Sequence, residues 1–185
     1  MRATIGCSLM LALAGRGFGG DSVKSNEPEI PRKLELNDQY DKAQVMTFPA
    51  TNVIFLTIAD RKGSDQIGAW ITALKARPAT VVDIRGLADL GGVPGFLRGR
   101  IRKQFREAIQ YPVMMDWSGK VCAKFNYVPD LANIYIIDRN GNLAGHFHGR
   151  AVETNLNAAF VALDKAAATP VVNSTNRQPV TAGMP

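Results

Sequence analysis

An uninterrupted apolar run, followed at once by a polar loop and an amphipathic helix, most constrains how this chain can fold. The run, NVIFLTIA, covers residues 52–59 and lacks the alternation of a strand with one exposed face. It is typical of a strand buried on both sides, in a sheet covered by helices. After the loop, the spacing of Ile67, Trp70, Ile71 and Leu74 predicts one apolar helical stripe. The sequence therefore predicts an α/β protein.

Strand and helix patterns alternate through the rest of the centre. The expected strands are 34–36 and 44–48 around a turn at 37–41, then 52–59, 79–84, 112–116, 134–137 and 143–147. The expected helices are one from Ser64 or Asp65, as cap, to Pro78, then 96–110, 121–125 and 155–168, with a glycine-rich loop at 86–95. Asn140 and Gly141 indicate a hairpin. This order predicts a mixed central β-sheet flanked by helices, with an N-terminal β-hairpin.

Both ends differ in composition from the centre. Residues 1–14 have Arg2 before an apolar stretch that is too short to span a bilayer, the pattern of a short export signal. A mis-assigned start or an uncleaved leader is the alternative. We expect a flexible linker at 15–32, the folded domain at 33–168 and a disordered tail at 169–185. An export signal predicts a periplasmic or secreted protein.

The cysteine content limits the redox chemistry of the chain. There are two cysteines, and Cys7 would leave with the signal, so Cys122 would remain alone. A single cysteine excludes an intramolecular disulfide and a Cys-x-x-Cys dithiol. The sequence also lacks zinc-site spacing, a phosphate loop and a Gly-x-Ser-x-Gly elbow, so it predicts neither a metal nor a cofactor.

Three segments carry a family resemblance: LELNDQYDKAQVMTFPATNVIFLTIADRKG, PVMMDWSGKVCAKF and NIYIIDRNGNLAGHFHG. They resemble the thioredoxin-like superfamily, in particular its bacterial redoxin and thiol-disulfide oxidoreductase branch, over most of residues 33–167. The resemblance implies a thioredoxin-like fold. In that family the first long strand ends at a Cys-x-x-Cys motif on a helix N-terminus. Placed on this chain without gaps, the motif falls on Lys62, Gly63, Ser64 and Asp65, which we call the motif loop.

The chain departs from this family at two parts of the dithiol site. The motif loop has no sulfur, and Lys62 and Asp65 stand where the family has its thiols. The cis-proline of the family corresponds to Ala132, with Pro129 three residues earlier. These departures predict a binding or accessory module that presents loops 60–65 and 86–95 to an unknown protein or small molecule, without dithiol chemistry.

Cys122 provides an alternative with enzymatic activity. A lone thiol can act as a one-cysteine peroxidase or thiol oxidoreductase if it is exposed and its pKa is lowered, and Lys120 and Lys124 lie near it in sequence. The other interpretation is that Cys122 packs between Val121 and Ala123 as a small apolar residue.

A basic segment carries much of the net charge of +6. Arg98, Arg102 and Arg106 are four residues apart and share a helical face, which could bind phosphate, anionic lipid or an acidic partner. A solvated helix face is the alternative interpretation. No aromatic residues are interleaved with these charges, which disfavours nucleic acid as a partner. The opposite, core-facing stripe is expected to be Ile101, Phe105 and Ile109.

Two other sets of residues could act as metal ligands. His146 and His148 alternate on an expected strand and so point to one side, but no third metal ligand accompanies them. Two polar residues on an exposed strand face are the other interpretation. Asp83, Asp116 and Asp138 lie at or near expected strand ends, where they could meet at one sheet edge and bind a cation, or cap turns.

Overall fold

The computed structural model describes residues 27–77 and 81–172. Within these ranges no helix has the length and apolar character needed to cross a membrane. The expected export signal (1–14) lies outside the described residues, as do the expected linker (15–32) except for residues 27–32 and the expected tail (169–185) except for residues 169–172.

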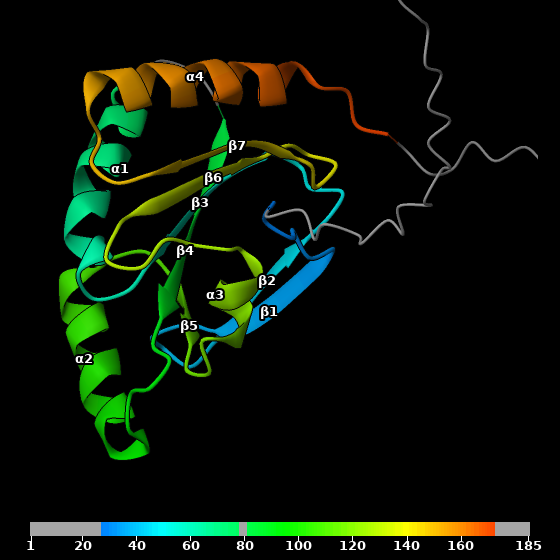
Figure 1. Cartoon of the computed structure of the whole chain (residues 1–185). Coiled ribbons are helices and arrows are strands. Elements are labelled where there is room, and N and C mark those ends of the chain that lie inside the picture. The colour runs from blue at the N-terminus through cyan, green and yellow to red at the C-terminus, as the bar shows by residue number, and fades with distance from the viewer. Residues whose placement is uncertain (1–26, 78–80, 173–185) are drawn as a thin grey trace, which may run out of the picture.

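A five-stranded mixed sheet forms the centre of the fold (Figure 1). Its strand order is β5-β4-β3-β6-β7, in which β3, β4 and β5 are parallel and β6 and β7 are antiparallel to their neighbours. The mixed sheet predicted from the sequence is confirmed. The seven strands of the described chain are β1 (Lys33–Asn37), β2 (Ala43–Thr47), β3 (Val53–Ala59), β4 (Val82–Asp89), β5 (Val113–Asp116), β6 (Asn133–Ile137) and β7 (Leu143–His148).

Helices cover the sheet and connect its strands. The α-helices are α1 (Ile67–Lys75), α2 (Arg98–Ala108), α3 (Lys120–Lys124) and α4 (Glu153–Ala168), and short 3-10 helices η1 (Gly63–Gln66) and η2 (Gly95–Leu97) precede α1 and α2. Figure 1 shows α1 and α4 on one side of the sheet, and α3 with the hairpin of β1 and β2 on the other.

The central strand β3 explains why the sheet has a core on each face. All seven of its residues are buried, as its uninterrupted apolar run predicts. Phe55 packs with Trp70 and Leu163 under α1 and α4, whereas Ile54 and Leu56 belong to the cluster under the hairpin and α3. Successive side chains of a strand point to opposite faces, so one strand supplies both clusters.

The hairpin of β1 and β2 closes the second cluster. The two strands pair antiparallel, as predicted, and Leu34 and Met46 face the sheet. Packing starts slightly before the expected domain boundary at 33, because the Glu29 backbone N–H donates to the Lys124 carbonyl (3.0 Å) and Ile30 packs against the same cluster.

The second parallel strand is longer than the sequence predicts. We expected it to end at Ile84, because Arg85 and Gly86 interrupt the apolar pattern, but β4 continues to Asp89. Gly86 sits beside β5, where an added Cβ would lie 3.0 Å from a Val113 methyl group. The expected loop 86–95 therefore begins only after Asp89, and four of its residues belong to the sheet.

Candidate functional site

The motif loop is held by one carboxylate at the end of β3. Asp60 accepts hydrogen bonds from the backbone N–H groups of Lys62 (3.0 Å), Gly63 (2.8 Å) and Asp130 (2.7 Å). Burial alone would raise the pKa of Asp60, but these bonds and the Lys62 charge outweigh it and hold the pKa below its ordinary value. The prediction that Ser64 or Asp65 caps this helix is wrong, because Asp60 binds the N–H groups there and the Ser64 hydroxyl donates to the Arg61 carbonyl.

The loop before β6 lies directly against the motif loop. The Lys62 ammonium is 2.8 Å from the Asp130 carboxylate. A Cβ added to Gly63 would lie 2.2 Å from the Leu131 carbonyl oxygen and 3.1 Å from the Ala132 nitrogen. Gly63 is needed here because two backbone segments meet where no side chain fits. The structure thus brings together the segments that the resemblance aligns with the family's cysteine motif and proline.

Cys122 lies on α3 and not on the element that holds the motif loop, and its side chain has 0% exposure. It packs in the cluster with Phe125 and Ile137. Burial raises the pKa of the Cys122 thiol strongly, and the nearby carboxylates of Asp116 and Asp89 raise it further. The structure therefore stabilises the neutral thiol.

Asp116 connects β5 to the start of α3. One carboxylate oxygen accepts the backbone N–H groups of Val121 (2.7 Å) and Cys122 (2.9 Å), and the other accepts the N–H and hydroxyl of Ser118 (3.1 and 2.7 Å). Burial alone would raise the pKa of Asp116, but these four bonds hold it below its ordinary value. Asp116 is therefore a structural carboxylate.

The three aspartates expected at one sheet edge do not form a cluster. Asp83 lies near the start of β4 and pairs with Arg85 (2.8 Å), and Asp138 accepts hydrogen bonds within the β6–β7 turn. The error arose because β4 was expected to end soon after Asp83. Within residues 27–77 and 81–172 no three His, Cys, Asp or Glu side chains are arranged to hold a metal ion.

The arginine face of α2 contacts the rest of the chain. Arg102 donates to the Asp41 carboxylate (2.8 Å), and Arg106 donates to the Gln39 carbonyl (3.0 Å) in the β1–β2 turn. The guanidinium groups of Arg98 and Arg102 also lie over the Trp117 ring. Arg98 and Arg106 are exposed, in keeping with the solvated face that the sequence suggested, but all three arginines also make intramolecular contacts.

The two histidines of β7 have different environments. The His146 ring stacks on Tyr135, with ring centroids 4.2 Å apart, and lies half-buried, while His148 is exposed. Burial, assisted by the charge of His148, holds the pKa of His146 below its ordinary value. The expectation that both lie on an exposed face is therefore wrong for His146.

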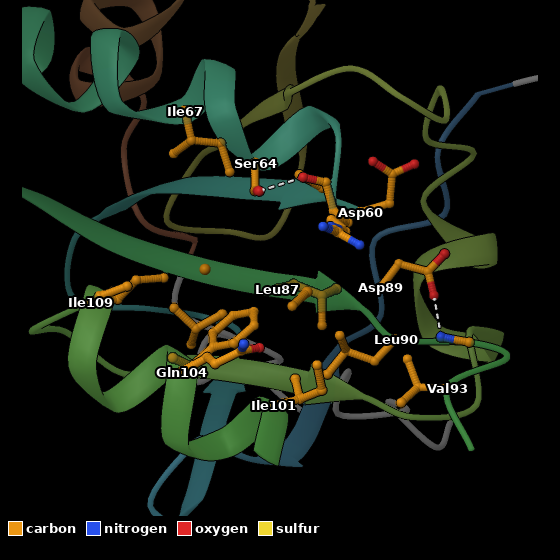
Figure 2. A pocket seen from close by; sticks show the side chains of 18 of the residues that line it. Asp60, Ser64, Ile67, Leu87, Asp89, Leu90, Val93, Ile101, Gln104 and Ile109 are labelled. Atoms are coloured by element: carbon orange, nitrogen blue, oxygen red, sulfur yellow. Dashed lines mark hydrogen bonds between the residues drawn. The ribbon is translucent and has the colours of Figure 1, made fainter. Parts of the chain in front are cut away.

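A cleft of about 920 Å³ lies beside the motif loop (Figure 2). Its floor includes Gly86 and Ala88 of β4, and Ile67 of α1 and Ile101 of α2 stand on opposite sides of that strand. Sequence reasoning missed this cleft, because the predicted end of the strand at Ile84 left its floor in a loop.

One end of the cleft is fixed by a second aspartate that the sequence did not single out. Asp89 accepts hydrogen bonds from the Gly91 N–H (2.8 Å) and from the Tyr127 hydroxyl. Burial and this bond to Asp89 raise the pKa of Tyr127, so the phenol stays protonated. Asp89 therefore positions the start of the loop that follows β4.

Solved structures similar to this one share the thioredoxin-like fold. StoA from Bacillus subtilis matches with a TM-score of 0.53 and 9% identity, over 73% of this chain and 98% of that one. A DsbF homologue from Corynebacterium diphtheriae matches with a TM-score of 0.53 and 13% identity, over 82% of this chain and 99% of that one. The pneumococcal exposed lipoprotein thioredoxin Etrx1 from Streptococcus pneumoniae matches with a TM-score of 0.52 and 17% identity, over 72% of this chain and 98% of that one.

The likeness extends to the fold alone. No protein-family model matches the chain, and no curated protein matches it. The fold predicted from the resemblance is thereby confirmed: the chain has a thioredoxin-like domain, and it lacks the Cys-x-x-Cys motif.

Proposed function

We propose that this chain is an exported thioredoxin-like binding module that performs no dithiol redox chemistry. One observation carries the proposal: Lys62 and Asp65 occupy the positions of the family's two thiols, and Cys122, the free cysteine of the described residues, is fully buried on another element.

The motif loop has a different chemistry from a thiolate site. A reactive thiolate at a helix start depends on free N–H groups and the positive end of the helix dipole. Here the carboxylate of Asp60 already binds the N–H groups of Lys62 and Gly63. The N–H groups that would stabilise a thiolate are therefore occupied, so the loop suits positioning better than nucleophilic attack.

The alternative, a single-cysteine peroxidase or thiol oxidoreductase acting through Cys122, finds no support in the geometry. A peroxidatic thiol must be ionised and accessible. Cys122 has 0% exposure, and the carboxylates near it favour its neutral form.

The surface next to the motif loop is suited to binding. The loop after β4 leads into η2, whose Phe96 has the highest exposed fraction, 85%, among the exposed large hydrophobic side chains of residues 27–77 and 81–172. Loops on a rigid scaffold are common binding elements. A protein or small molecule is the partner class that this surface fits.

Export to the periplasm or the exterior is part of the same proposal. It is supported by the apolar N-terminal pattern at 1–14 and by the likeness to Etrx1, an exposed lipoprotein by its name. Expression of the complete chain in a bacterium, followed by fractionation and N-terminal sequencing, tests it. Recovery of the intact chain in the cytoplasm alone would contradict export.

The redox half of the proposal is tested by a disulfide-reduction assay on the complete purified chain, with Cys122→Ser as the control. We expect neither protein to reduce a peptide disulfide faster than buffer does. Catalysis by the natural chain that Cys122→Ser abolishes would overturn this half.

A further inference from the structure

The cleft between α1 and α2 has both an apolar body and a distinct set of unpaired polar groups. The apolar part is formed by small residues of the β4 floor and by side chains such as Ile67, Ile101 and Phe105. Figure 2 shows Ile67 on one side of the strand and Ile101 with Gln104 on the other. A cavity of about 920 Å³ is at the upper end of the range of small-molecule sites.

The carboxylates of the cleft already have partners. Asp60 accepts three backbone N–H groups, and Asp89 accepts the Gly91 N–H and the Tyr127 hydroxyl. The lining hydroxyl groups of Thr57 and Ser64 also donate within the chain. The two carboxylates can still accept but cannot donate, and the hydroxyl protons of Thr57 and Ser64 are already used within the chain.

The lining polar side chains that lack a partner are mostly donors. Neither Arg61 nor Arg100 forms an ion pair or a side-chain hydrogen bond with another described residue, and the same holds for the side-chain amide of Gln104 and the hydroxyl of Tyr111. A guanidinium presents five N–H donors and no acceptor. Both guanidinium groups are exposed, so water solvates them in the free protein, and an oxyanion is the ligand group that could replace that water.

We propose that this cleft binds an amphipathic monocarboxylate, whose apolar body lies on the β4 floor and whose carboxylate is bound by Arg61 and Arg100. Arg61 lies directly before the motif loop and Arg100 lies on α2, so the two arginines line the cleft from different elements. The inference deepens the proposed function by naming a ligand class, and it rests on that function in treating the domain as a binding module. The apolar body of the ligand can be an alkyl chain or a ring, and the experiment below distinguishes these two.

The test is calorimetric titration of the complete chain with decanoate and 2-naphthoate, each paired with its neutral counterpart, decanol or 2-naphthol. We expect at least one carboxylate to bind with a dissociation constant on the order of 0.1 mM, and its neutral counterpart about tenfold more weakly. The body that binds better identifies the chain or the ring. Equal affinity for acid and neutral counterpart, or no binding of either acid, would overturn the proposal.

Variants locate the head group. Arg61→Gln and Arg100→Gln should each weaken carboxylate binding about tenfold, because each removes a charge-assisted hydrogen bond. Lys165→Gln, on the exposed side of α4, removes the same charge outside the cleft and should leave affinity unchanged. Equal weakening by all three variants would mean nonspecific attraction and would overturn the assignment.

Failure of this proposal can be separated from failure of the proposed function. In the same samples, alkylation of Cys122 is followed by peptide mass spectrometry. A protected Cys122 with no carboxylate binding would reject the ligand class alone, whereas a reactive Cys122 would reject the non-redox function whatever the cleft binds.

Discussion

The ammonium of Lys62 and the carboxylate of Asp130 are 2.8 Å apart, and this ion pair joins the motif loop to the loop before β6. The segments that the resemblance aligns with cysteine and proline thus remain in contact in this chain, through different side chains. Both groups are largely exposed, so the pair orients the two loops more than it stabilises them.

The alignment of the motif loop can be tested by restoring sulfur. In the double variant Lys62→Cys with Asp65→Cys, we expect the introduced thiols to form a reversible disulfide, because they would lie one turn apart at a helix start. Mass spectrometry after alkylation, with and without reductant, measures it. Two outcomes would show that the gapless alignment is wrong. One is that the double variant forms no disulfide, and the other is that each single-cysteine variant resists alkylation as strongly as the double variant does.

Gly63 and Gly68 provide a matched pair of substitutions. Gly63→Ala should lower the free energy of unfolding by about 1–3 kcal/mol, because its methyl group would meet the Leu131 carbonyl. Gly68→Ala, on α1 with no atom within 4 Å of the added carbon, should raise it by about 0.5–1 kcal/mol. Urea denaturation measures both, and equal effects would contradict the close approach at Gly63.

The sequence predicted the elements of this fold well where the pattern was unambiguous. The apolar run of β3 and the Asn140–Gly141 turn each determine their element locally. The end of β4 could not be predicted, because Arg85 and Gly86 read as a break in the apolar pattern. Tertiary contacts decide there, since Gly86 packs on Val113 and Arg85 pairs with Asp83.

The candidate site was predictable only in part. Alignment of the motif loop indicated which residues replace the cysteines, but Asp60 joins the two loops through the N–H group of Asp130, 70 residues away. Likewise, the contacts of Arg102 and Arg106 depend on the β1–β2 turn lying beside α2. Spacing within one helix carries no information about such long-range partners.

Asp116 should be essential for the local structure of α3. Asp116→Asn should lower the free energy of unfolding by about 2–3 kcal/mol, because an amide cannot accept the four hydrogen bonds that the buried carboxylate accepts. The control is Asp164→Asn, whose exposed pair with Arg77 should contribute less than about 1 kcal/mol. Equal losses by urea denaturation would refute this role.

His146 should make stability depend on pH near neutrality. Its folded pKa is below its ordinary value of 6.5, so as the pH falls through that value the unfolded chain binds a proton first. The contribution of His146 is thus fully present above about pH 6.5 and is lost as the pH falls toward the folded pKa.

Variants separate the two histidines. His146→Phe keeps a ring against Tyr135 and should flatten the fall in stability between about pH 7 and pH 5, measured by urea denaturation at each pH. His148→Gln should leave most of this fall in stability unchanged. If the free energy of unfolding of His146→Phe fell with pH as steeply as that of the natural chain, the pH dependence would belong to other groups.

The most direct test of the account is the rate at which peroxide oxidises Cys122 in the native, complete chain, followed by trapping and peptide mass spectrometry so that Cys7 is scored separately. We predict that Cys122 is oxidised at least about tenfold more slowly than a free thiol, and that denaturation abolishes this protection. Rapid oxidation of native Cys122 that a reductant reverses would contradict the account and establish a thiol-dependent enzyme in its place.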